Sequence, residues 1–189
     1  MNIKKPRSRD RQFLFLALVP AYFILVGFFL QSPGEILQGI FTIIREPDFL
    51  ITDYFIIGGV GAAFVNAGIL TLVSIGIVYG LGMDFDGHTI TSACLMFGFS
   101  LFGKNLLNIW AIMLGVFLYA RYHRTSVSRY IYIGYYGTSL SPIITQVMQM
   151  WELPIPVRMG LCILTGTVIG FVLPPLCTHC LLYTSDAAD

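Results

Sequence analysis

The side chains most able to do chemistry lie in the stretch FGFSLFGKNLLN, which runs from Phe97 to Asn108 between two apolar segments. It contains one ammonium group, Lys104, and two amides, Asn105 and Asn108. In a membrane, irregular polar backbone is tolerated only inside protein or beside a water-filled cavity. An ionisable residue at that depth is by default a functional-site hypothesis. We therefore interpret this stretch as the first candidate for a solute site.

A second polar cluster, DFDGH, contains Asp84, Asp86 and His88. Two carboxylates and an imidazole suit a divalent cation and could give a membrane-embedded enzyme a metal site and a general base. No second cluster completes the coordination shell, and Gly87 favours a turn. The sequence also has no HExxH motif, hydrolase serine motif or phosphate-binding loop. We expect a solvated loop here, no enzyme activity and no cofactor or metal, with the metal enzyme as the alternative.

The composition identifies the surroundings of these residues. The 189 residues are 56% hydrophobic and 11% charged, with a mean hydropathy of +0.78, whereas soluble domains have about 25% charged residues. The chain is therefore expected to be an integral membrane protein. A net charge of +1 without a basic stripe excludes a nucleic-acid partner. Four cysteines in or beside apolar runs are expected to be small apolar side chains rather than disulfide or zinc ligands: Cys94, Cys162, Cys177 and Cys180.

The apolar runs that must position the polar stretch predict an all-α fold, a polytopic transmembrane helical bundle with short, broken or re-entrant helices. The predicted spans lie near residues 13–30, 54–82, 89–103, 105–121, 130–150 and 157–177, and an amphipathic interfacial helix covers 34–46. Basic residues before the first span predict a cytoplasmic N-terminus. We expect a multi-pass plasma-membrane protein whose main partner is the lipid bilayer.

The second predicted span is too long to be one straight helix. Its uncharged run of residues 54–81 would measure about 42 Å against a hydrocarbon core of about 30 Å. A break is favoured at Gly58, Gly59 and Gly61. Small residues here and in the last span predict close helix contacts and a possible homo-oligomer. Asn66 should point into the bundle, where its side chain either hydrogen-bonds neighbouring helices together or lines a solute pathway.

The two segments on either side of Lys104 are too short to cross the bilayer comfortably. In one arrangement they form a re-entrant or broken pair whose tip lies near the midplane. A helix opening at Asn105 would then put a positive dipole end beside the ammonium, which attracts an anion or a neutral polar solute and repels cations. In the other arrangement both segments extend into full spans and Lys104 snorkels at the outer surface. The second is favoured because lysine near a helix end is commoner than lysine at depth.

Three sequence blocks resemble a known family. They are ITDYFIIGGVGAAFVNAGILTLVS (51–74), FGFSLFGKNLLNIWAIMLGVFLYARY (97–122) and GFVLPPLCTH (170–179), and they are similar to the bacterial membrane family catalogued as domain of unknown function 1576 (DUF1576). The resemblance implies a bacterial multi-span protein longer than this chain, and it transfers no catalytic residues because the family has no assigned activity.

The last ten residues, 180–189, resemble the translation of a transposon-type sequencing adaptor, and we interpret them as an artefact rather than native sequence. Residues 1–179 would then be an N-terminal membrane domain, half of a larger protein built from repeats.

Discontinuous helices with a binding site near the midplane are a general feature of transporters. The sequence therefore favours a transporter or channel for a small polar or anionic solute. The alternatives are the membrane-embedded enzyme and a structural or sensory protein in which the polar residues only hold helices together. The expected pathway residues are Asn66, Lys104, Asn105 and Asn108, with Ser100 and Thr138 as secondary polar lining.

Overall fold

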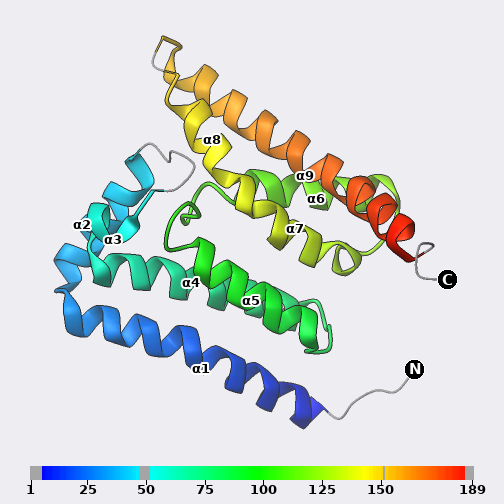
Figure 1. Ribbon diagram of the computed structural model, residues 1–189, viewed down its shortest axis with the longest axis horizontal. Coiled ribbons are helices and arrows are strands. Elements are labelled where there is room, and N and C mark those ends of the chain that lie inside the picture. The colour runs from blue at the N-terminus through cyan, green and yellow to red at the C-terminus, as the bar shows by residue number, and fades with distance from the viewer. Residues whose placement is uncertain (1–5, 47–51, 151, 186–189) are drawn as a thin grey trace. The chain divides into compact units, whose positions relative to one another are not determined.

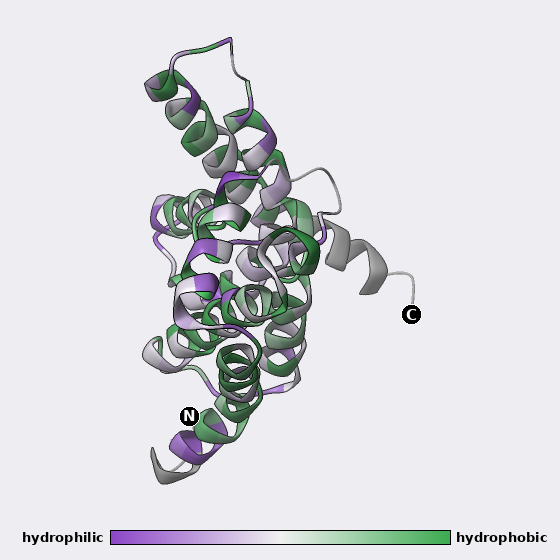
Figure 2. Cartoon of the chain, turned by 90° about the vertical axis from the view of Figure 1, so that its left-hand side faces the viewer, coloured by the Kyte–Doolittle hydropathy of each residue, from purple (hydrophilic) through white to green (hydrophobic). Residues whose placement is uncertain are grey.

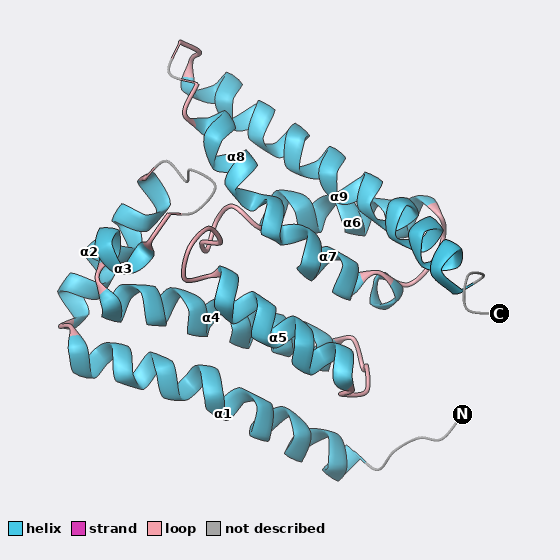
Figure 3. Cartoon of the chain, viewed as in Figure 1, coloured by secondary structure: helices cyan, strands magenta, loops and turns pink. Residues whose placement is uncertain are grey.

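The computed structural model describes residues 6–46, 52–150 and 152–185, which form helices joined by short loops (Figure 3). For these residues the prediction of an all-helical chain is confirmed. The chain divides into two compact units, Met1–Leu107 and Asn108–Asp189. Helices α1 to α5 belong to the first unit and α6 to α9 to the second (Figure 1).

The first unit is built on three helices that lie side by side, α1, α4 and α5 (Figure 1). Two shorter helices, α2 and α3, lie between α1 and α4 in sequence, and α2 packs against α3 and the first turns of α4, where Gly39 meets Gly58 and Ala62. The bounds are α1 Pro6–Leu30, α2 Pro33–Arg45, α3 Tyr54–Gly58, α4 Val60–Gly80 and α5 Gly87–Phe99.

Glycines let α1 and α4 approach backbone to backbone. A Cβ added at Gly27 would lie 2.8 Å from the carbonyl oxygen of Gly61, and one at Gly68 would lie 2.8 Å from that of Pro20. Close packing of this kind stabilises membrane helices, between which no hydrophobic driving force acts in lipid. The small residues of α4 are thus used for contact with α1 of the same chain.

The long apolar run breaks at Gly59, which separates α3 from α4. Gly59 has φ +85° and ψ 159°, a conformation that is essentially restricted to glycine. The side chain of Gln31, which follows α1, packs beside this break, and its Oε1 accepts a hydrogen bond of 2.9 Å from the backbone N of Ala62. Gln31 therefore caps α4 from another helix and satisfies one of its first N–H groups.

Helix α2 begins with a complete capping box. The Ser32 Oγ accepts from the backbone N of Glu35, and a carboxylate oxygen of Glu35 accepts from the backbone N of Ser32 at 2.8 Å. The hydrogen bonds from the backbone and side chain of Ser32 lower the pKa of Glu35 below its usual value. The helix start is therefore fixed by two residues next to the end of α1.

The second unit contains one long helix, α9, packed along α6 and the shorter helices. A Cβ at Gly170 of α9 would lie 1.9 Å from the carbonyl oxygen of Ile112 in α6, so the two backbones touch. Gly160, on the same helix, has no such neighbour within 4 Å. The bounds are α6 Trp110–Tyr122, η1 Val127–Arg129, α7 Ile131–Gly137, η2 Thr138–Leu140, α8 Ser141–Met148 and α9 Ile155–Ser185.

Within the part of the chain that the structure describes, three helices are long and apolar enough to cross a membrane: Arg9–Leu30, Val60–Gly80 and Ile155–Thr178. The apolar character of the helices can be followed in Figure 2. Their length and composition indicate a helical membrane protein. The helical region predicted over 130–150 is instead divided into α7, η2 and α8, none of which has the length of a span.

The two segments around Lys104 are shorter than the sequence predicted. Helix α5 ends at Phe99 and α6 begins at Trp110, so residues 100–109 form turns and loop, and no helix opens at Asn105. Each helix has 13 residues, about 20 Å. At the other end of the chain, α9 runs through residues 180–185, and 186–189 lie outside the described residues. The assignment of 180–189 as an artefact stays a prediction.

Candidate functional site

Lys104 is enclosed within the loop that follows α5. It is 1% exposed, and its Nζ lies 3.4 Å from the sulfur of Met96 and 5.0 Å from the centre of the Phe99 ring. Both neighbours belong to the last turns of α5, since the chain turns back on the helix after Ser100. The ammonium therefore meets a soft sulfur and an aromatic face, both of which attract a cation.

Asn66 of α4 ties this loop to a candidate span. Its Nδ2 donates to the carbonyl oxygens of Ser100, at 2.7 Å, and Lys104, at 2.9 Å. Asn66 is fully buried and stands six residues after the start of α4, about 9 Å along the helix axis. Two carbonyls that no helix satisfies are therefore paired inside the protein, as irregular backbone in a membrane requires.

The loop itself is fixed by local hydrogen bonds. The Ser100 hydroxyl donates to the carbonyl of Met96, and the backbone N of Lys104 donates to the carbonyl of Phe99 at 3.0 Å. The Oδ1 of Asn105 accepts from the backbone N of Leu107 at 3.0 Å, which forms a local turn. Ser100 and Asn105 are 0% and 2% exposed. These two side chains thus shape the loop around Lys104.

The other amide atom of Asn66 has a different environment. Its Oδ1 is buried and accepts no hydrogen bond from any residue that the structure describes. The assignment of nitrogen and oxygen follows from the partners, because the atom opposite two carbonyl oxygens must be the donor. A buried acceptor without a donor costs about 1–3 kcal/mol. Asn66 therefore presents an acceptor that a polar molecule could satisfy.

Two of the predicted pathway residues belong to the second unit. Asn108, 6% exposed, donates from Nδ2 to the hydroxyl of Thr145 at 3.2 Å. Thr138, fully buried, donates to the carbonyl of Tyr135 at 2.7 Å. The first unit therefore brings together Asn66, Ser100, Lys104 and Asn105, while Asn108 and Thr138 form separate contacts in the second unit.

The burial of Lys104 bears on the two arrangements that the sequence left open. Snorkelling requires an ammonium that extends to water, and Lys104 is almost fully enclosed. The enclosed geometry instead resembles the interior arrangement, although the helix expected at Asn105 is replaced by loop. The depth of Lys104 in the bilayer stays a prediction.

Asp84, Asp86 and His88 precede α5. Asp86 is the N-cap of α5, where its Oδ1 accepts from the backbone N of Thr89 at 3.0 Å. Burial acts to raise the pKa of the Asp86 carboxyl, but the hydrogen bonds from Thr89, together with the charge and backbone N–H of His88, outweigh this effect and the net pKa is lowered. Over the described ranges, no three His, Cys, Asp or Glu side chains are grouped to hold a metal ion. Asp86 therefore has a structural role at the start of the helix.

Sequence reasoning missed the direct neighbours of the candidate residues, namely Met96, Phe99 and Thr145. Met96 and Phe99 read as ordinary apolar helix positions, because the reversal that brings Lys104 back onto them depends on where α5 ends. Thr145 is equally inconspicuous, since a threonine in an apolar helix usually bonds its own backbone. A signal was present only for the reversal, in Gly103 before Lys104.

Comparisons with known proteins give a family and no closer match. A family model described as "Protein of unknown function (DUF1576)" matches residues 32–186, which is most of the chain. No curated protein and no solved structure matches. The matched range includes every residue of the candidate site.

Proposed function

The chain belongs to the DUF1576 family, and we propose that it is a transporter or channel that passes a small polar or anionic solute across the bacterial plasma membrane. In this proposal the protein is multi-pass with a cytoplasmic N-terminus. The proposal depends above all on one observation, the enclosed ammonium of Lys104 in a loop bonded to the candidate span α4.

The free-energy cost of burying an ionisable side chain supports a functional role for Lys104. Ionisable residues inside membrane proteins are expensive to bury and commonly mark solute or ion pathways. A neutral residue of similar size, such as methionine, would fill the same space next to Met96 and Phe99 without that cost. The ammonium is therefore proposed to act on a solute rather than to stabilise the fold.

The groups in the first unit suit a polar solute. The ammonium of Lys104 can donate hydrogen bonds but cannot accept them, so it favours an anion or another ligand with an acceptor. The Oδ1 of Asn66 favours a ligand with an N–H or O–H group. A small anion suits the ammonium, and a small neutral solute with both kinds of group suits either atom, whereas free cations are repelled by Lys104.

The competing function is a structural or sensory one. The two hydrogen bonds from Asn66 to the loop favour it, since polar side chains also hold membrane helices together. The two functions differ in what Lys104 does. If the protein is purely structural, it carries no solute flux, and replacing Lys104 by methionine changes none.

Stopped-flow light scattering of proteoliposomes tests the proposal. Vesicles containing the full chain are exposed to an inward gradient of glycerol, a small neutral solute, or of potassium formate, the salt of a small anion, with valinomycin present so that K⁺ can follow the anion. We expect the protein to accelerate re-swelling with at least one of them over empty vesicles, and Lys104→Met to remove most of the acceleration.

Arg121→Met is the matched control, because it removes one exposed positive charge from the last turn of α6. It should leave the flux unchanged. Equal flux in folded Lys104→Met and the unmodified chain would contradict a role for Lys104. Re-swelling no faster than that of empty vesicles with either solute would contradict the transport proposal itself.

A further inference from the structure

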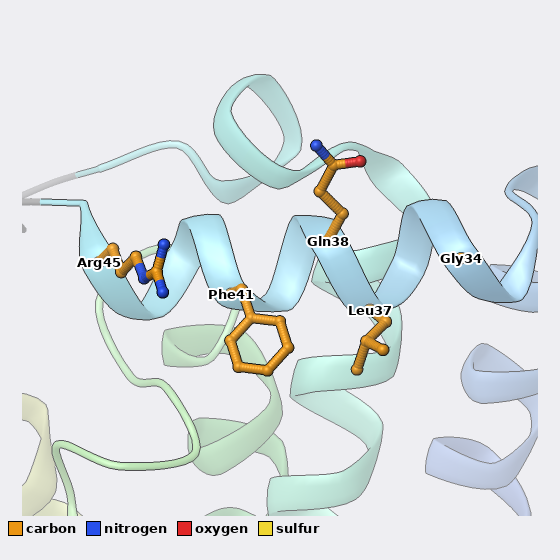
Figure 4. A pocket seen from close by; sticks show the side chains of 5 residues that line it. All are labelled: Gly34, Leu37, Gln38, Phe41 and Arg45. Atoms are coloured by element: carbon orange, nitrogen blue, oxygen red, sulfur yellow. The ribbon is translucent and has the colours of Figure 1, made fainter.

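Helix α2 has a second, open face that packing within the chain does not cover. Its buried face, formed by Ile36, Gly39 and Ile43, packs on the first unit. Leu37 and Phe41 are 58% and 51% exposed. With Gly34, Gln38 and Arg45 they line an open groove of about 370 Å³ (Figure 4). We call it the α2 groove.

The α2 groove is apolar on one side and polar on the other. Figure 4 shows Leu37 and Phe41 pointing to one side of α2 and Gln38 pointing to the other, with Arg45 in the last turn. Leu37, Phe41 and Arg45 follow one another at intervals of four residues, so they line one stripe of the helix. An apolar stripe therefore ends at a guanidinium group.

Chain connectivity determines what surrounds this groove. The candidate span Arg9–Leu30 ends two residues before the N-cap Ser32, so α2 starts where a span leaves the hydrocarbon core. A helix with one apolar side, beginning at that level, lies in the headgroup region. The molecules present there at the highest concentration are phospholipids, which combine acyl chains with a phosphate.

We propose that the α2 groove binds one phospholipid, with an acyl chain on Leu37 and Phe41 and the phosphate on Arg45. A guanidinium group can bind phosphate oxygens through two parallel N–H donors. The pairing matches both parts of the ligand: apolar contact on one side of α2 and a charge-assisted hydrogen bond at its end. The site is distinct from the Lys104 loop and does not depend on transport.

Tryptophan quenching by brominated lipid tests this binding. Phe41→Trp places the reporter in the groove, in a background where Trp110 and Trp151 are replaced by phenylalanine. The protein is reconstituted into digalactosyl diacylglycerol, which has acyl chains but no phosphate, and phosphatidylglycerol with brominated chains is added. We expect half-maximal quenching at a mole fraction roughly tenfold below that of a randomly mixed lipid shell, because charge-assisted bonds to phosphate are strong.

Substitutions at Arg45 separate a bound lipid from a random shell. Arg45→Gln should return half-maximal quenching to the random value, and Arg45→Lys should give an intermediate one because it keeps the charge but not the fork of donors. Arg121→Gln, also in the last turn of a 13-residue helix, should leave quenching unchanged. Identical curves for Arg45→Gln and Phe41→Trp alone would overturn the proposal. Absence of quenching even in pure brominated lipid would overturn it too, since protein would then cover the groove.

Discussion

The side-chain amide of Asn66 donates a 2.9 Å hydrogen bond to the main-chain carbonyl of Lys104, 38 residues further along the chain. The same nitrogen donates to Ser100. One residue of α4 thereby determines where the loop after α5 lies, and with it the place of the only lysine in the described residues. The structural and the proposed functional roles of the site are thus separated between a positioning residue, Asn66, and a charged residue, Lys104.

The first prediction concerns the free energy of unfolding of Asn66→Leu. The substitution leaves the carbonyls of Ser100 and Lys104 buried without their donor, and each such group costs about 1–3 kcal/mol. We expect a loss of about 2 kcal/mol or more, measured by chemical or thermal unfolding in detergent. The control is Thr71→Val, in the same helix, whose hydroxyl donates only to Ala67 of its own helix. If Asn66→Leu loses no more unfolding free energy than the control, the two hydrogen bonds from Asn66 do not hold the loop.

The second prediction concerns the stability of Lys104→Met. Replacement of a buried charged group by a well-packed apolar one is often neutral or stabilising. We expect the free energy of unfolding to stay the same or to rise by up to about 2 kcal/mol, while flux falls as described above. Unfolding curves and re-swelling rates are measured on the same preparation. A destabilised Lys104→Met would instead identify the ammonium as part of the fold.

The third prediction compares two glycines near or within α4. Gly59→Ala puts a Cβ on a residue with φ +85° beside Gln31, and should lower stability by about 1–3 kcal/mol. Gly76 has open space around its Cβ position, so Gly76→Ala should be neutral or stabilise the helix by up to about 1 kcal/mol. The thermal midpoint should therefore fall in Gly59→Ala and stay the same or rise in Gly76→Ala. A parallel shift would contradict the assigned break at Gly59.

The fourth prediction is a pH dependence that originates in the α2 cap. The pKa of Glu35 is lowered in the folded protein from 4.5, so its ionised form contributes stability above 4.5 that is lost as pH falls through the folded pKa. Glu35→Gln keeps a hydrogen-bonding side chain at this position but removes the charge. We expect the stability difference between the two proteins to be present at pH 6 and to shrink below pH 4.5. A difference that stays constant with pH would contradict the prediction.

The sequence was informative where composition and backbone chemistry decide the structure. An all-helical fold follows from the long apolar runs, and the break at Gly59 lies among the three glycines, Gly58, Gly59 and Gly61, at which it was expected. The polar stretch around Lys104 was recognised because charge is rare in such a chain. These features depend on local residue types, so a single sequence is enough to predict them.

Long-range pairing was beyond the sequence. The loop after α5 is held by hydrogen bonds from Asn66 and from Tyr54, whose backbone N donates to Leu101 at 3.2 Å. Since these partners are distant in sequence, apolar periodicity extended both helices into the loop. The grouping of six polar residues as one pathway also exceeded what short-range patterns can establish, because Asn108 and Thr138 belong to a different compact unit.

The cap that Gln31 provides to Ala62 has a consequence for the order of membrane insertion. Gln31 follows α1 and is therefore synthesised before α4. An N–H group that enters lipid unpaired costs several kcal/mol. The cap on α4 therefore comes from the helix that precedes it, and Gln31 can accept from Ala62 as soon as α4 packs against α1.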